Sequence, residues 1–191
     1  MTTPDPKAGK RISYLPTPGL SYDPAEAKYW DPAALEGEIR RAFEVCNGCR
    51  MCFKYCDSFP RLFDMVDATP SGEVHDVKSA DFKPVVDACT LCDLCFMTKC
   101  PYVPPHEFNL DFPHLMLRYR ALEARAGHIA FAERELTKTD RNGKLAGMVA
   151  PLANWASSTS NALTRPALET LAGVDRRAHL PKFHGQTFAM R

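Results

Sequence analysis

The chain has 191 residues, a formal net charge of +1 and a hydrophobic content of 45%. This length accommodates one or two small domains with a packed core. The balance of 24 basic and 23 acidic residues gives no electrostatic case for binding nucleic acid. No stretch approaches the roughly 20 apolar residues of a membrane-spanning helix, and the residues from Met1 to Pro6 lack the apolar segment of a secretory signal.

Residues 1–30 are predicted to form an extended N-terminal arm. Proline has no amide hydrogen for regular structure, and this segment holds Pro4, Pro6, Pro16, Pro18 and Pro24. Its later part is too apolar for a free tail, because it holds Tyr14, Leu15, Leu20, Tyr22, Tyr29 and Trp30. We therefore expect that part to lie along the body of the protein or along a partner.

A first helix is predicted to begin after Asp31. The Asp31 carboxylate can accept hydrogen bonds from the free amides of the first turn, and Pro32 suits the first helical position. The apolar residues that share one face of this helix are Leu35, Ile39, Ala42, Phe43 and Cys46. A second helix, with Pro60 in its opening turn, has the apolar set Phe59, Leu62, Phe63 and Val66.

The order of helix, cysteine run and helix then occurs again. The third predicted helix carries Phe82, Val85, Val86 and Cys89, and it can contain Pro84 only in its first turn. The fourth begins after Asp111, ends at Gly127 and carries Phe112, Leu115, Met116, Tyr119 and Leu122. We interpret residues 31–127 as a duplicated, mainly α domain whose two copies pack about a pseudo-twofold axis.

Residues 128–191 contain no cysteine and are predicted to form a helical extension, or a connector to a partner or to a further domain. One apolar stripe consists of Leu145, Met148, Val149, Leu152 and Trp155, with a kink expected at Pro151. A further helix around Pro166 ends at Gly173. We favour helices that cover the core, or a surface for a protein partner, over a membrane-facing surface.

All eight cysteines lie in two runs, Cys46–Cys56 and Cys89–Cys100. Each run has three cysteines at three-residue steps and a fourth a little further on. A [4Fe–4S] cube needs one thiolate per iron, and in two-cluster bacterial ferredoxins the fourth cysteine of each run binds the other cluster. By that rule Cys46, Cys49, Cys52 and Cys100 hold one [4Fe–4S] cluster, and Cys89, Cys92, Cys95 and Cys56 hold the other.

The neighbours of the cysteines fit such a site. Gly48 is expected to let the backbone approach a cluster, and Pro101 to turn the chain away. The apolar residues expected to exclude water are Met51, Phe53, Leu91, Leu94 and Phe96. Two features depart from the small βαββαβ ferredoxin pattern: four residues separate Cys95 from Cys100, and Asp57 rather than proline follows Cys56.

Two other uses of the cysteines fit the spacing less well. Paired Cys-x₂-Cys motifs form four-cysteine zinc sites, but the third cysteine of each triple would then be surplus. Disulfides suit a secreted protein, and the spacing together with the absence of a signal segment favours reduced thiols in a cytosolic setting. We therefore place iron–sulfur clusters before zinc, and zinc before disulfides.

The segments around the cysteines resemble a known family. They are Glu44–Cys56, Ala88–Cys95, Cys100–Tyr102 and His106–Pro113. Together they resemble the iron–sulfur subunits of the heterodisulfide reductase family, which includes the iron–sulfur subunit of anaerobic glycerol-3-phosphate dehydrogenase. The resemblance extends from Ile12 onward and implies an α-helical ferredoxin-like module with two clusters. Many members continue into domains with Cys-Cys-Gly motifs, whereas this chain has no cysteine after Cys100.

These patterns predict an electron-transfer subunit or module of a larger oxidoreductase. We find no phosphate loop, dinucleotide fingerprint or nucleophile elbow, so substrate chemistry is expected elsewhere. The resemblance implies a flavin-bearing donor and a Cys-Cys-Gly-type or quinone-reactive acceptor. A cytoplasmic location is expected, with peripheral association at the inner face of the membrane left open. The alternatives are a structural metal-binding module and, after it, a redox sensor.

Overall fold

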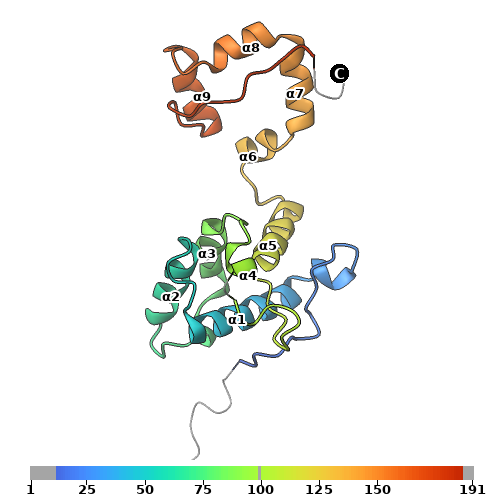
Figure 1. Cartoon of the computed structure of the whole chain (residues 1–191), viewed down its shortest axis with the longest axis vertical. Coiled ribbons are helices and arrows are strands. Elements are labelled where there is room, and N and C mark those ends of the chain that lie inside the picture. The colour runs from blue at the N-terminus through green and yellow to red at the C-terminus, as the bar shows by residue number, and fades with distance from the viewer. Residues whose placement is uncertain (1–11, 99, 187–191) are drawn as a thin grey trace, which may run out of the picture. The chain divides into compact units, whose positions relative to one another are not determined.

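The structure is a computed structural model that describes residues 12–98 and 100–186. Within these ranges the regular secondary structure is entirely helical, so the predicted mainly α fold is confirmed (Figure 1). The chain divides into two compact units, which are separated between Ala126 and Gly127. Residues 1–11 of the predicted arm and 187–191 of the predicted extension lie outside the described residues.

The first unit contains five α-helices and three short 3₁₀-helices in the part of the chain that the structure describes. The α-helices are α1 (Pro32–Cys49), α2 (Ser58–Asp67), α3 (Lys83–Ala88), α4 (Leu94–Thr98) and α5 (Phe112–Ala126). The 3₁₀-helices are η1 (Ala27–Trp30), η2 (Val74–Asp76) and η3 (Ser79–Phe82).

The predicted start of α1 is confirmed. An Asp31 carboxylate oxygen accepts a hydrogen bond from the Ala33 amide at 2.9 Å, and Pro32 occupies the first helical position. The helix ends at Arg50, whose backbone is left-handed with φ of 52° and whose amide donates to the Cys46 carbonyl at 2.8 Å. Because α1 continues to Cys49, it contains the first two cysteines of the first run.

The limits of the later helices also agree with the sequence. Pro84 stands in the first turn of α3, where its missing amide hydrogen costs no helical hydrogen bond. At α5, an Asp111 carboxylate oxygen accepts from the His114 amide at 3.0 Å. Gly127, just beyond the last turn, has φ of +81°, a conformation that side chains with a Cβ rarely adopt.

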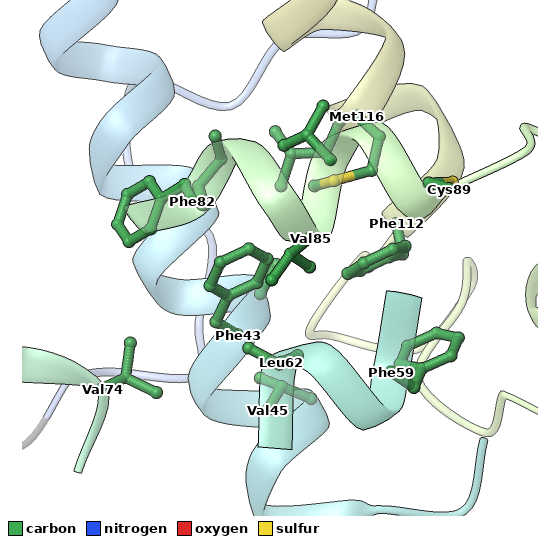
Figure 2. Close-up of a cluster of buried hydrophobic side chains, with 14 of the residues drawn as sticks. Phe43, Val45, Phe59, Leu62, Val74, Phe82, Val85, Cys89, Phe112 and Met116 are labelled. Carbon is green, nitrogen blue, oxygen red and sulfur yellow. The ribbon is translucent and has the colours of Figure 1, made fainter. Parts of the chain in front are cut away.

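One apolar core joins the two halves of the first unit (Figure 2). Helix α2 packs on α3, and α1 packs on α5. A twofold operation that exchanged α1 with α3 and α2 with α5 would produce this pairing. Aromatic rings meet across the halves, with ring centroids 5.3 Å apart for Phe43 and Phe82 and 4.9 Å apart for Phe59 and Phe112. Such contacts stabilise the unit beyond the burial of area alone.

Residues 12–30 lie along the first unit and are held there mainly by buried arginines. Arg118 of α5 is fully buried and donates to the carbonyls of Gly19, Ser21, Lys28 and Tyr29. A guanidinium group satisfies several carbonyls at once because its five donors form a rigid fork. Tyr29, at the end of this segment, is itself buried.

A second buried arginine belongs to an ion pair on α1. Arg41 and Glu38 are almost fully buried, and their charged atoms lie 2.7 Å apart. Arg41 also donates to the carbonyls of Tyr14 at 2.9 Å and Phe108 at 2.7 Å, while Glu38 accepts from the Thr17 amide at 2.8 Å. The pair therefore joins the N-terminal segment and the loop after Cys100 to α1.

The second unit comprises four helices in its described part, followed by an extended segment. The helices are α6 (Phe131–Leu136), α7 (Thr139–Met148), α8 (Ala150–Ser157) and α9 (Thr164–Ala172). Gly173 ends α9 with φ of +67°, as predicted. The Asn154 amide group of α8 binds both the N–H and the carbonyl of Phe183 at 2.8–2.9 Å, which ties the extended segment to the helices.

The predicted apolar stripe of this unit does not form part of a core. Its members are about half-exposed or more: Leu145, Met148, Val149, Leu152 and Trp155. These side chains are therefore not buried within the second unit, and the expectation of a surface for a protein partner stays a prediction. The chain also breaks at Val149 into two separate helices, rather than bending at Pro151, because the Val149 backbone is not helical. Among residues 12–98 and 100–186, no helix is long and apolar enough to cross a bilayer.

Candidate iron–sulfur sites

The first cavity brings together four cysteines from both runs. It encloses about 300 Å³ and is lined by Cys46, Cys49, Cys52 and Cys100. Cys46 and Cys49 come from the end of α1, and Cys52 from the turn that follows it. Cys100 arrives from the second run, where its amide donates to the Cys95 carbonyl at 3.1 Å.

The second cavity has the reciprocal composition. It encloses about 310 Å³ and is lined by Cys56, Cys89, Cys92 and Cys95. Cys89 directly follows α3, Cys95 lies in the short helix α4, and Cys56 comes from the first run. Each cavity thus holds three cysteines of one run and the fourth cysteine of the other. This grouping is the one that the crossed-ligand rule predicts, and the ligand assignment itself stays a prediction.

A third hollow of about 260 Å³ lies where the two groups of cysteines approach each other. Its lining includes Cys46, Cys52 and Cys100 from the first group and Cys95 from the second. Phe59 and Phe112 also line it, so the core aromatics of Figure 2 lie directly beside the cysteines. The two sites are therefore neighbours across a thin apolar partition.

The local backbone of both cysteine runs combines helix with tight turns. The first run begins as helix and turns at Arg50. In the second run Leu91 and Asp93 have φ of 55° and 57°, after which α4 begins. Left-handed residues reverse the chain within a few positions and aim successive side chains at a common centre. No glycine marks these turns, so the sequence carries no signal that places them.

Burial disfavours free thiolates at several of the cysteines, whereas a backbone hydrogen bond at Leu94 lowers the pKa of the exposed Cys92. Burial raises the pKa of Cys46 well above its ordinary value and that of Cys52 to about 11, and neighbouring cysteines add to both effects. Burial likewise raises the pKa of Cys95 to about 12. Crowded, buried thiols become thiolates when a cationic centre stabilises their charge. Eight soft sulfur donors in two groups of four therefore fit iron–sulfur clusters.

The apolar lining is partly different from the residues expected. Met51 lines the first cavity and Leu94 the second, but both are more than 40% exposed, as is Phe53. The buried lining comes from Phe59 and Phe63 of α2, Phe112 of α5 and the loop residue Leu110, with Pro113 beside them. Phe59, Phe63 and Phe112 already belonged to predicted helical stripes. Their place beside the cysteines was missed because it depends on how the two halves pack.

Gly48 has a structural role that the sequence did not indicate. A Cβ at this position would lie 2.8 Å from the Tyr14 hydroxyl oxygen. The glycine therefore makes room for a side chain of the N-terminal segment, while the close approach of its backbone to a cluster stays a prediction. Tyr14 in turn lies edge-on to Phe108, with ring centroids 5.4 Å apart.

A single-ion site is not formed by the described residues. Within 12–98 and 100–186, no three histidine, cysteine or acidic side chains converge closely enough to hold one metal ion. Four sulfur ligands of one zinc ion lie about 3.8 Å apart, given Zn–S bonds of about 2.3 Å in a tetrahedron. The ligands of a cube bind four separate irons. An iron–sulfur cluster would therefore occupy one of the cavities, and it does not need its four ligands gathered around a single ion.

Comparison with known proteins identifies the first unit. Residues 31–126 match the family described as the citrate utilization protein B Fer4-like domain. The chain belongs to this family. The match spans the region from the cap of α1 to the end of α5, and hence every cysteine. The predicted iron–sulfur, ferredoxin-like module is thereby confirmed, while its finer placement among heterodisulfide reductase-type subunits stays a prediction.

A curated protein is also similar to part of this chain. Citrate utilization protein B of Escherichia coli is 32% identical over 85 residues, which are 44% of this chain and 20% of the relative. The aligned region therefore spans one fifth of the length of that protein. No solved structure matches the chain.

Proposed function

We propose that this domain binds two [4Fe–4S] clusters and transfers electrons between them within a larger oxidoreductase. The observation that carries the proposal is the pair of cavities, each lined by four cysteines drawn from both runs. The family match supports iron–sulfur electron transfer in general terms. The number of clusters, their type and the membership of a complex go beyond that match and are proposed on the cavities and the cysteine spacing.

The proposed ligands follow the cavity linings. The first site would use Cys46, Cys49, Cys52 and Cys100, and the second Cys56, Cys89, Cys92 and Cys95. An iron–sulfur cluster supplies a one-electron carrier whose potential depends on charge, hydrogen bonds and burial. Phe59 and Phe112 keep water from the partition between the sites, and the crossed cysteines hold the two halves of the unit together.

The partners are proposed from what the chain lacks and from its relative. It has no recognised nucleotide-binding motif, and the E. coli relative is much longer than the matched region. We propose that a flavin-bearing donor and a quinone-reactive or Cys-Cys-Gly-type acceptor lie in other domains or subunits, as in heterodisulfide reductase-type assemblies. The relative's name refers to citrate utilization. We propose that the oxidoreductase containing this domain acts in the metabolism of carboxylic acids such as citrate. A cytoplasmic location, with peripheral contact at the membrane, belongs to this proposal.

Anaerobic purification tests the proposal. We expect a brown protein with about eight irons and eight sulfides per chain, because two cubes contain four of each. Reduction should produce paramagnetic resonance signals of reduced [4Fe–4S] clusters. A colourless protein with two zinc ions per chain would favour a structural metal-binding module instead. Clusters that no physiological-range potential reduces would also contradict electron transfer.

A further inference from the structure

The second cavity has charged residues beside it, whereas none of the described residues lining the first cavity is charged. Asp93 lines the second cavity directly. Arg120 of α5 approaches the same cysteines from the side of the core. Its Nη2 atom donates to the Cys89 carbonyl at 2.5 Å and to the Val86 carbonyl at 2.6 Å. The second site therefore has a cation and an anion beside its cysteines.

The hydrogen bonds place Arg120 at a defined point. Val86 lies in the last turn of α3, and Cys89 caps that helix. The last carbonyls of a helix lack partners within the helix, and one guanidinium group donates here to the carbonyls of Val86, Asp87 and Cys89. A side chain held by two short hydrogen bonds keeps its charge beside Cys89, whereas a free surface lysine would move away.

Asp93 acts in the opposite sense. It lies between Cys92 and Cys95 in the sequence, and its carboxylate adds a negative charge to the lining of the cavity. The neighbouring Cys92 is exposed, so solvent screens this charge in part, as it does at any accessible position. The two charges therefore oppose each other at the same group of sulfurs.

We propose that Arg120 is a positioning residue of the second site, and that Arg120 and Asp93 set its reduction potential with opposite signs. The inference rests on the proposed function. Adding one electron to the site makes it more negative by one charge, so a nearby cation favours the reduced form and a nearby anion opposes it.

The test is a mediated redox titration of the full chain with its clusters, reduced by dithionite and followed by paramagnetic resonance. In Arg120→Gln one of the two midpoint potentials should fall by about 59 mV, which is tenfold in the equilibrium constant for one electron. The other should stay unchanged. Asp93→Asn should raise the same midpoint, and Arg120→Lys, which keeps the charge, should stay close to the unsubstituted protein.

Arg125→Gln is the matched control. Arg125 lies on the same helix, and its substitution by Gln makes the same change in net charge. Its guanidinium, however, stacks on Trp30, with 4.7 Å to the ring centroid. It should move neither midpoint. Equal shifts in Arg120→Gln and Arg125→Gln, or a shift of the same sign in Asp93→Asn, would overturn the inference.

Two results separate this inference from the proposed function. If the unsubstituted chain holds no clusters, the proposed function fails. If it holds two clusters and Asp93→Asn, at an accessible position, leaves both midpoints unchanged, only the charge inference fails. Loss of four irons in Arg120→Gln, with full iron in Arg120→Lys, would support the positioning role of Arg120. The midpoint potential of Asp93→Asn would then decide whether charge sets the potential of the second site.

Discussion

The two units of the chain are built by different means. The first has a continuous apolar core and buries the aromatic rings of both halves beside the cysteines. In the described part of the second, Ala150 and Arg165 alone are buried, while many large apolar side chains are exposed. Arg165 donates to the carbonyls of Ser157, Asp175, Arg176 and Ala178. Hydrogen bonds therefore hold the second unit together, whereas apolar packing stabilises the first.

Truncation of a large apolar side chain should give the largest difference between the two units in the loss of unfolding free energy. Phe43 is fully buried between Phe82 and Phe112, whereas Leu163 of the second unit is 81% exposed. Phe43→Ala should lower the free energy of unfolding by about 3–5 kcal/mol, because it leaves a cavity in the core. Leu163→Ala should change it by less than about 0.5 kcal/mol. Anaerobic thermal unfolding of the cluster-loaded protein measures both, and similar losses would remove the contrast.

The ion pairs of the two units should also differ. Removing Glu38 leaves the charge of Arg41 buried without its partner, which costs about 3–5 kcal/mol, so Glu38→Ala should strongly destabilise the first unit. The Asp175–Arg177 pair of the second unit is exposed, and exposed pairs contribute little to stability. Asp175→Ala is thus the matched control. A small effect of Glu38→Ala on the unfolding midpoint would contradict the importance of the buried pair.

The smallest effect concerns pH and the second unit. Hydrogen bonds from Lys138 and Arg141 lower the pKa of Glu135 from 4.5 to about 2. Because the pKa is lower in the folded state, this carboxylate stabilises the fold above about pH 4.5, and its contribution disappears as pH falls toward 2. The Glu135 carboxyl resonance, followed by NMR, should titrate near 2. In Lys138→Ala its midpoint should rise, and an unchanged midpoint would exclude Lys138 as a cause.

Local signals explain why much of the first unit could be predicted. Caps such as Asp31 and Asp111, the position of Pro84 and the helical stripes each depend on residues a few positions apart. The grouping of Cys100 with the first run and Cys56 with the second also agreed with the crossed rule. The resemblance to heterodisulfide reductase-type subunits indicated the ferredoxin-like module that the family match confirms.

The differences from the sequence-based expectations arise where contacts between residues distant in the sequence determine the surroundings of a side chain. Gly48 accommodates Tyr14, which is distant in sequence, and both Met51, which lines the first cavity, and Phe53 are more than half exposed. Hydrophobic periodicity shows which residues share a helix face but not what that face meets. For that reason the stripe around Trp155 could be recognised from the sequence, but its exposure could not.

The central claim is that each cluster takes its fourth cysteine from the other run, and iron content in double variants tests it most directly. If Cys56 binds with Cys89, the Cys56→Ser/Cys89→Ser protein loses one cluster and keeps about four irons per chain, whereas Cys56→Ser/Cys46→Ser loses both and keeps almost none. The reverse pattern, with about four irons in Cys56→Ser/Cys46→Ser and almost none in Cys56→Ser/Cys89→Ser, would contradict the account.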